Sequence, residues 1–175
     1  DTLSPTYVSS LTTSTTTIDV TFSEDLNGAT VNNADFSVDG YTVDSVSESF
    51  GVVTITTTTA FGPGETPDVS YNQAPTGVDD LQGNLGLGWG PETPADGVAP
   101  YVVSAEADTS SGAMAAGAHV LIEFSEAMDT ATIQAGSLDG DLVLSGGAGT
   151  NTWGTSATMA WLAGNTKLRI TLGTS

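Results

Sequence analysis

The chain has 175 residues, with 21 acidic side chains against two basic ones, Lys167 and Arg169, for a formal net charge of −19. Such a surface repels nucleic acid and anionic membranes and attracts cations, so neither nucleic acid nor a membrane is an expected partner. The absence of cysteine excludes disulfides and thiol chemistry, and no apolar run reaches the roughly 18 residues of a membrane span.

Residues 17–22 show a clear strand pattern. Ile18, Val20 and Phe22 alternate there with polar residues, which is typical of a strand with one buried face. Similar patterns continue along the first half of the chain, separated by turn residues such as Asp39-Gly40. The predicted strands are residues 5–11, 17–22, 34–38, 41–46, 51–57, 68–71 and 85–89, with one short helical turn at 26–31.

A break follows the last of these strands. Pro91 and Pro94 stiffen residues 91–99, which are therefore predicted to form a short, semi-rigid linker. A second unit then begins at Pro100. Its predicted strands are residues 100–104, 119–124, 142–144 and 166–172, with a Gly-rich hairpin loop at 146–149.

The segment at residues 20–31 recurs at residues 122–133. At one fixed offset, the residues Phe22, Ser23, Glu24, Ala29 and Thr30 realign with Phe124, Ser125, Glu126, Ala131 and Thr132. A repeat of domain size indicates a tandem array. Short strands with turn signals every 8–12 residues or so, and almost no helical periodicity, predict an all-β chain of two antiparallel β-sandwiches, residues 1–90 and 100–175.

The second unit is expected to be incomplete as given. In this alignment it has no counterpart of the strand at 68–71, of the loop at 79–84 or of the closing strand. A sandwich without its last strands has an open edge that invites pairing. Either the natural chain continues, which is the favoured alternative, or another chain donates the missing strands.

Short motifs in both units resemble a known family. They are residues 5–10, 21–26 and 80–84 in the first unit and residues 100–104 and 123–128 in the second. Together they are similar to the tandem bacterial Ig-like domains of S-layer proteins and large surface adhesins. The resemblance extends over essentially the whole chain and implies Ig-like sandwiches in an exported, extracellular, non-enzymatic protein of the cell surface. The second unit departs from the pattern, because it has no Asp-x-x-Gly-Asn segment.

The residues offer little for catalysis. His119 is the only histidine, it lies within a predicted strand, and no Gly-x-Ser-x-Gly elbow accompanies it. Carboxylates are so abundant that a pair suited to glycoside hydrolysis is expected by chance, and only Trp89, Trp153 and Trp161 suggest sugar stacking. Zinc would need more His and Cys ligands than the chain has. We therefore expect no enzyme.

One acidic constellation suggests a cofactor. In an Ig-like sandwich, the loop after the second strand and the loop before the last strand meet at the pole where the chain enters. Hard oxygen ligands gathered there suit Ca²⁺. The predicted ligands are Glu24, Asp25, Asp79, Asp80 and Asn84 in the first unit, and Asp96, Glu126 and Asp129 where the linker meets the second. The alternative is a set of solvated acidic turns, in which Asp and Asn serve as turn formers.

These observations favour a structural function: a segment of a self-assembling extracellular surface layer of the S-layer kind. Its expected partners are copies of itself or neighbouring domains of the same chain. Two alternatives stay open. One is an adhesin or stalk segment that binds carbohydrate or another surface, and the other is a filament subunit completed by strand donation.

Overall fold

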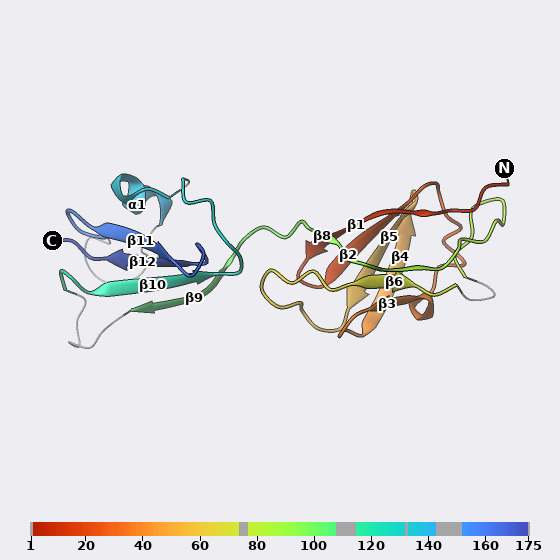
Figure 1. Ribbon diagram of the computed structural model, residues 1–175, viewed down its shortest axis with the longest axis horizontal. Coiled ribbons are helices and arrows are strands. Elements are labelled where there is room, and N and C mark those ends of the chain that lie inside the picture. Colours follow the sequence, from red (N-terminus) through yellow and green to blue (C-terminus); the bar gives the residue numbers. More distant parts are fainter. Residues whose placement is uncertain (1, 74–76, 108–114, 132, 143–151, 175) are drawn as a thin grey trace. The chain divides into compact units, whose positions relative to one another are not determined.

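A computed structural model describes all residues except 1, 74–76, 108–114, 132, 143–151 and 175 (Figure 1). By its internal contacts the chain divides into two compact units, Asp1–Ala99 and Pro100–Ser175. Each unit is built mainly of antiparallel strands. The predicted all-β, Ig-like sandwich class is confirmed.

Unit one consists of two sheets. The larger sheet has the strand order β4 (Val43–Ser49), β5 (Val52–Thr57), β2 (Thr17–Phe22), β1 (Tyr7–Ser14) and β8 (Ala95–Asp96), in which only β8 runs parallel to its neighbour. The smaller sheet has the order β3 (Phe36–Val38), β6 (Val69–Tyr71) and β7 (Trp89–Glu92), and the 3-10 helix η1 (Asn33–Asp35) leads into β3.

The core of unit one lies between these sheets. Alternation buries Ile18 and Val20 of β2, and Val53 and Ile55 of β5, completely. The facing side chains come from the smaller sheet and include Phe36, Val38, Val69 and Tyr71. Each large aliphatic side chain buried in this way stabilises the fold by roughly 1.5–3 kcal/mol.

Unit two repeats the larger sheet. Its strand order is β11 (Thr158–Leu162), β12 (Lys167–Thr171), β10 (His119–Phe124) and β9 (Val102–Ala107), which matches β4-β5-β2-β1. The 3-10 helix η2 (Ala135–Ser137) leads into the single-turn helix α1 (Leu138–Asp141), and the inner face of the sheet packs against Ile133, against Leu138 of α1 and against Trp153. The core residues are Val120, Ile122, Phe124, Ile133, Leu138, Trp153, Leu168 and Ile170.

Three predicted elements of unit one differ from the structure. In place of the predicted helical turn at 26–31 there is a single hydrogen-bonded turn, in which the Thr30 amide donates to the Asn27 carbonyl (2.9 Å). The Asn27 side chain accepts from the Ala29 amide (3.2 Å), a local bond that competes with a helix. The predicted closing strand at 85–89 begins only at Trp89. The predicted linker at 91–99 contains the end of β7 and all of β8, and β8 pairs with β1.

Unit two differs as well. Leu142 follows α1 directly and donates its amide to the Leu138 carbonyl (2.9 Å), so it does not begin a strand. The rest of the predicted strand at 142–144 and the loop at 146–149 lie outside the described residues. The hairpin partner of β12 is β11, which the sequence pattern did not predict.

Candidate functional site

Four segments meet at the pole where the chain enters unit one, and we call them the entry pole: residues 3–6, 23–27, 50–51 and 79–87. Ser23 joins the first two by a reciprocal pair of bonds. Its amide donates to the Thr6 carbonyl (2.9 Å), and its hydroxyl accepts from the Thr6 amide (3.0 Å). The Phe22 amide donates to the Gly51 carbonyl (2.8 Å), and the Asn27 amide to the Asp79 carbonyl (2.8 Å). The repeated Phe-Ser-Glu motif therefore holds the entry strand.

Unit two forms the same contacts from the second copy of the motif. The Ser125 amide donates to the Tyr101 carbonyl (2.9 Å), and its hydroxyl accepts from the Tyr101 amide (3.0 Å). The Phe124 amide donates to the Thr166 carbonyl (2.9 Å). Both copies of the motif thus make the same backbone contacts, which assigns them the same structural role. Sequence reasoning aligned Ser23 and Ser125 but assigned no role to them.

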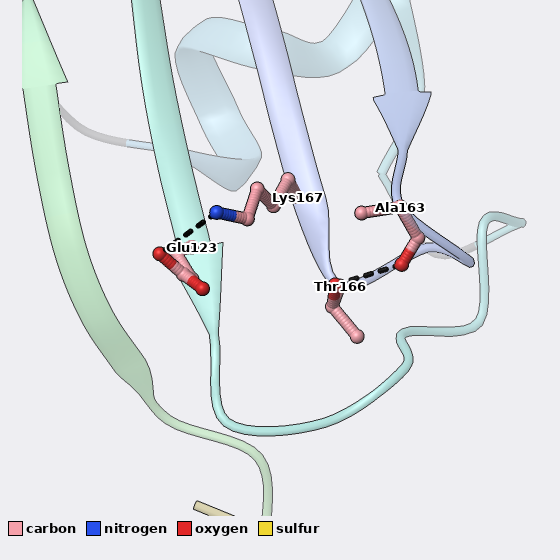
Figure 2. A network of polar contacts seen from close by, with 4 residues as sticks. All are labelled: Glu123, Ala163, Thr166 and Lys167. Carbon is pink, nitrogen blue, oxygen red and sulfur yellow. Dashed lines mark hydrogen bonds and ion pairs between the residues drawn. The ribbon is translucent and has the colours of Figure 1, made fainter.

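Figure 2 shows how this end of unit two is held. The Thr166 hydroxyl donates to the Ala163 carbonyl (2.8 Å) and closes the turn between β11 and β12. Beside it, the Lys167 ammonium lies 3.2 Å from the Glu123 carboxylate, with both side chains more than a third exposed. An exposed pair of this kind contributes at most about 1 kcal/mol.

The Asp80 carboxylate is engaged inside its own loop. One oxygen accepts from the amides of Gln82 (2.8 Å) and Asn84 (2.7 Å), and the other accepts from the Asn84 side-chain amide (2.7 Å). Burial by itself would raise the pKa of this carboxyl. The hydrogen bonds from Asn84, Gln82 and Gly83 outweigh it and hold the pKa of Asp80 below its usual value. Asp80 and Asn84 thus close a turn through hydrogen bonds within their own loop.

The other predicted ligands of unit one take different positions. An isolated antiparallel β-bridge between Leu26 and Asp80 brings the loop at 23–27 beside the loop at 79–87. The Asp79 carboxylate accepts a hydrogen bond from the Thr30 hydroxyl, while Glu24 is half-buried and Asp25 is exposed. Among the described residues, no three His, Cys, Asp or Glu side chains gather closely enough to hold a metal ion. Calcium binding at this pole stays a prediction.

The remaining predicted ligands lie on both units. The Asp96 carboxylate accepts from the Val98 amide (3.0 Å) and from the Thr12 hydroxyl (3.4 Å), which fixes β8 against β1. The Asp129 carboxylate accepts from the Ala131 amide (2.9 Å) in a local turn, and Glu126 is half-buried. That Asp96 faces Glu126 and Asp129 stays a prediction.

The candidates for catalysis and sugar stacking lie within the framework. His119 Nδ1 is 3.1 Å from the Thr171 hydroxyl, its partner across the β10–β12 ladder. Trp153 is 4% exposed and donates its indole N–H to the Leu142 carbonyl (2.6 Å). Trp89 packs on Tyr7, and Trp161 on Phe124, with both indole nitrogens buried. These side chains offer packing surface and no open aromatic platform.

The serine contact can be tested in unit two. Replacing Ser125 with Ala leaves the Tyr101 amide without its partner and should lower the stability of unit two by about 1 kcal/mol, or about 4–8 °C in Tm for a unit of this size. Thermal unfolding of Ser125→Ala against Thr130→Ala, an exposed neighbour, measures the difference. Equal Tm values for the two variants would contradict a structural role for the hydroxyl.

The Asp80 turn predicts a pH dependence. Since the folded-state pKa of Asp80 is lowered, its contribution to stability is complete above the unfolded value near 3.8 and is lost as pH falls through the folded pKa. Asp80→Asn should therefore lower Tm by several degrees at pH 7, and the gap to wild type should narrow below about pH 4. Exposed Asp25→Asn is the matched control. A gap that is the same at pH 7 and pH 3 would refute the prediction.

Comparison with known proteins gives one family and one group of structures. Three solved structures are similar to this chain. Surface layer protein SbsC, domains 1–6, has 24% sequence identity and a TM-score of 0.46, and the match covers 61% of this chain and 15% of that chain. The S-layer protein rSbsC(31–844) has 21% identity and a TM-score of 0.44 (74% of this chain, 18% of that chain), and the N-terminal part of the bacterial S-layer protein SbsC has 22% identity and a TM-score of 0.45 (74% of this chain, 32% of that chain). This chain thus spans less than a third of each of them, and the likeness concerns fold alone. No curated protein matches the chain.

None of the helices in the described ranges has the length and apolarity of a membrane span.

The family model for the bacterial Ig-like domain matches residues 1–89, a little more than half of the chain. That match covers both sheets of unit one up to the start of β7, including the whole entry pole with its serine contact. The chain therefore belongs to the bacterial Ig-like domain family.

Proposed function

We propose that this chain is a non-enzymatic structural segment of a self-assembling layer on the outside of a cell. The observation that carries the proposal is the repeated serine contact. In both units the polar groups of the repeated motif bind strand backbone, at Thr6 and at Tyr101, and hold the framework closed. Membership in the bacterial Ig-like family and the tandem arrangement support the same role.

The mechanism of such a segment is passive. Sandwich cores such as that around Ile18, Val53 and Tyr71 keep each unit rigid, since interiors of this kind pack as densely as organic crystals. A rigid unit presents the same surface to every neighbour, which a regular layer requires. The partners are then copies of the chain itself and neighbouring domains, and no reaction is involved.

Charge sets the conditions for assembly. At a net charge of −19, copies of the chain repel one another in solution, and divalent cations reduce that repulsion. Calcium is the cation that exposed carboxylates such as Asp25 would attract, because hard oxygen ligands suit it. A role for calcium in assembly is therefore part of the proposal, whether it binds at the predicted ligands or more loosely.

An adhesin is the second candidate, and one observation favours it. A hollow of about 490 Å³ in unit two is lined by residues that include Leu138, Asp139, Trp153 and Ser156. Mixed polar and aromatic linings suit carbohydrate. Because Trp153 is almost completely buried, the hollow offers little ring surface for stacking, and the layer stays the better supported proposal.

Electron microscopy of the purified chain tests the proposal. The protein is dialysed in parallel into calcium, into chelator, and into sodium chloride of matched ionic strength. We expect ordered sheets or filaments with calcium and far fewer in the other two buffers. Equal assembly in all three would remove the calcium role and keep the layer. Isolated particles in all three would overturn self-assembly and favour the adhesin.

A further inference from the structure

Phe50 is the most exposed large apolar side chain of the chain's described part, at 87%. It is the first residue of the two-residue turn between β4 and β5, where Ser49 pairs with Val52. Both turn residues have positive φ, +52° at Phe50 and +75° at Gly51, as a type I′ hairpin turn requires. Asn, Asp or Gly is favoured at the first position, so neither the turn nor the core explains a phenylalanine there.

The turn that carries Phe50 is nevertheless held closely at its second residue. A Cβ added to Gly51 would lie 2.6 Å from the Glu24 carbonyl oxygen, and the Gly51 amide donates to the Glu48 carboxylate (2.9 Å). The turn therefore holds the ring outward at the entry pole, with acidic residues on both sides. Neither of the chain's two basic residues belongs to unit one.

A shallow hollow of about 330 Å³ lies on the outer face of the unit-two sheet. It is lined by Glu106, Ala107, His119, Leu121, Leu162 and Arg169. Leu121 pairs across the ladders with Arg169 on one side and Glu106 on the other, and Leu162 is 38% exposed. The lining is mostly apolar and crosses all four strands.

Arg169 is the basic group of this hollow and shares it with the Glu106 carboxylate. The guanidinium is exposed and makes no salt bridge within the described residues, whereas Lys167 pairs with Glu123. Arginine stacks on aromatic rings and binds carboxylates through its planar group. The outer face of unit two thus combines apolar side chains with both basic residues of an otherwise acidic chain.

We propose that Phe50 of one copy docks into this outer-face hollow on unit two of a second copy. The ring contacts Leu121 and Leu162, and Arg169 meets the acidic residues beside Phe50, such as Glu48. Local charge complementarity identifies a second copy as the occupant: every charged side chain of unit one is acidic, and this face holds both basic side chains of the chain, of which Arg169 has no salt bridge among the described residues although Glu106 lines the same hollow. The inference rests on the proposed self-assembly and names its contact.

The contact joins two different surfaces, so it is heterologous. Each copy then offers one ring and one hollow, and the association propagates into a closed ring or an open filament instead of ending at a symmetric dimer. A layer or filament needs such propagation.

Phe50→Asn tests the contact without endangering the fold. Asn-Gly is a favoured type I′ pair, so Tm should be unchanged or higher. Sedimentation velocity over a concentration series should show association about thirtyfold weaker than in wild type, as for an aromatic anchor worth about 2 kcal/mol. The control is Leu81→Asn, which removes an exposed apolar side chain (65%) from a neighbouring loop and should associate like wild type.

Mixing two full-length variants tests the heterologous geometry. Phe50→Asn keeps the hollow, and Arg169→Glu keeps the ring, so each alone should be mainly monomeric and the equimolar mixture should form heterodimers that grow no further. A mixture that stays monomeric, or Phe50→Asn that associates like wild type, overturns this contact and leaves self-assembly intact. Wild type that stays monomeric at every concentration overturns the contact and self-assembly together.

Discussion

One pair of hydrogen bonds, made twice, fixes the framework of this chain. In each unit a serine directly after the second strand binds both polar groups of one residue in the entry segment, Thr6 or Tyr101. The bond places the preceding phenylalanine at the end of its strand, facing inward, so that Phe22 and Phe124 close their cores at 5% and 7% exposure. The position of the entry segment, the packing of the core and the loops of the entry pole all depend on this pairing of the serine with the entry segment.

Each unit has its own copy of the same four sheet strands, and the two units cover that sheet with different elements. In unit one, a second sheet faces β2 and β5, and Ile18 and Val20 have no exposed surface. In unit two, Ile133, Leu138 of α1 and Trp153 pack in the core with the corresponding strand, and Val120 and Ile122 keep 8% and 7% exposure. The difference is confined to this strand, because Leu168 and Ile170 of the neighbouring strand β12 have no exposed surface either.

The sequence predicted the elements whose pattern is set by burial on one face. Residues 17–22 and 119–124 alternate because one side of each strand meets the core, and the structure has strands with these bounds. The strand at 85–89 was misplaced because Gly86 and Gly88 sit where backbone approaches closely, and glycine leaves no side-chain pattern to interpret. The short strand β8 was missed because its pairing with β1 depends on Thr12, far away in sequence.

The candidate site was less predictable than the fold, for a physical reason. A sequence shows where carboxylates are but not which of them the fold itself engages. Asp80 and Asn84 bind each other and the loop backbone, and Asp96 binds Thr12, so these candidates already have protein partners. The serine contacts were equally hidden, since a hydroxyl after a strand has many possible partners, and only the aligned copies Ser23 and Ser125 hinted at a common one.

A chain with a single dominant sign of charge restricts how copies of it can associate. Long-range electrostatics oppose contact at −19, so attraction must come from short-range burial at sites where the local charges differ. A residue that its own turn conformation disfavours is a marker of such a site, because natural sequences depart from local conformational preferences mainly where function requires it. Phe50 departs from the turn rule at an exposed acidic tip, and Arg169 departs from the acidity of the chain on an apolar face. Each is unexplained within its own unit, and the contact that we propose between copies would account for both.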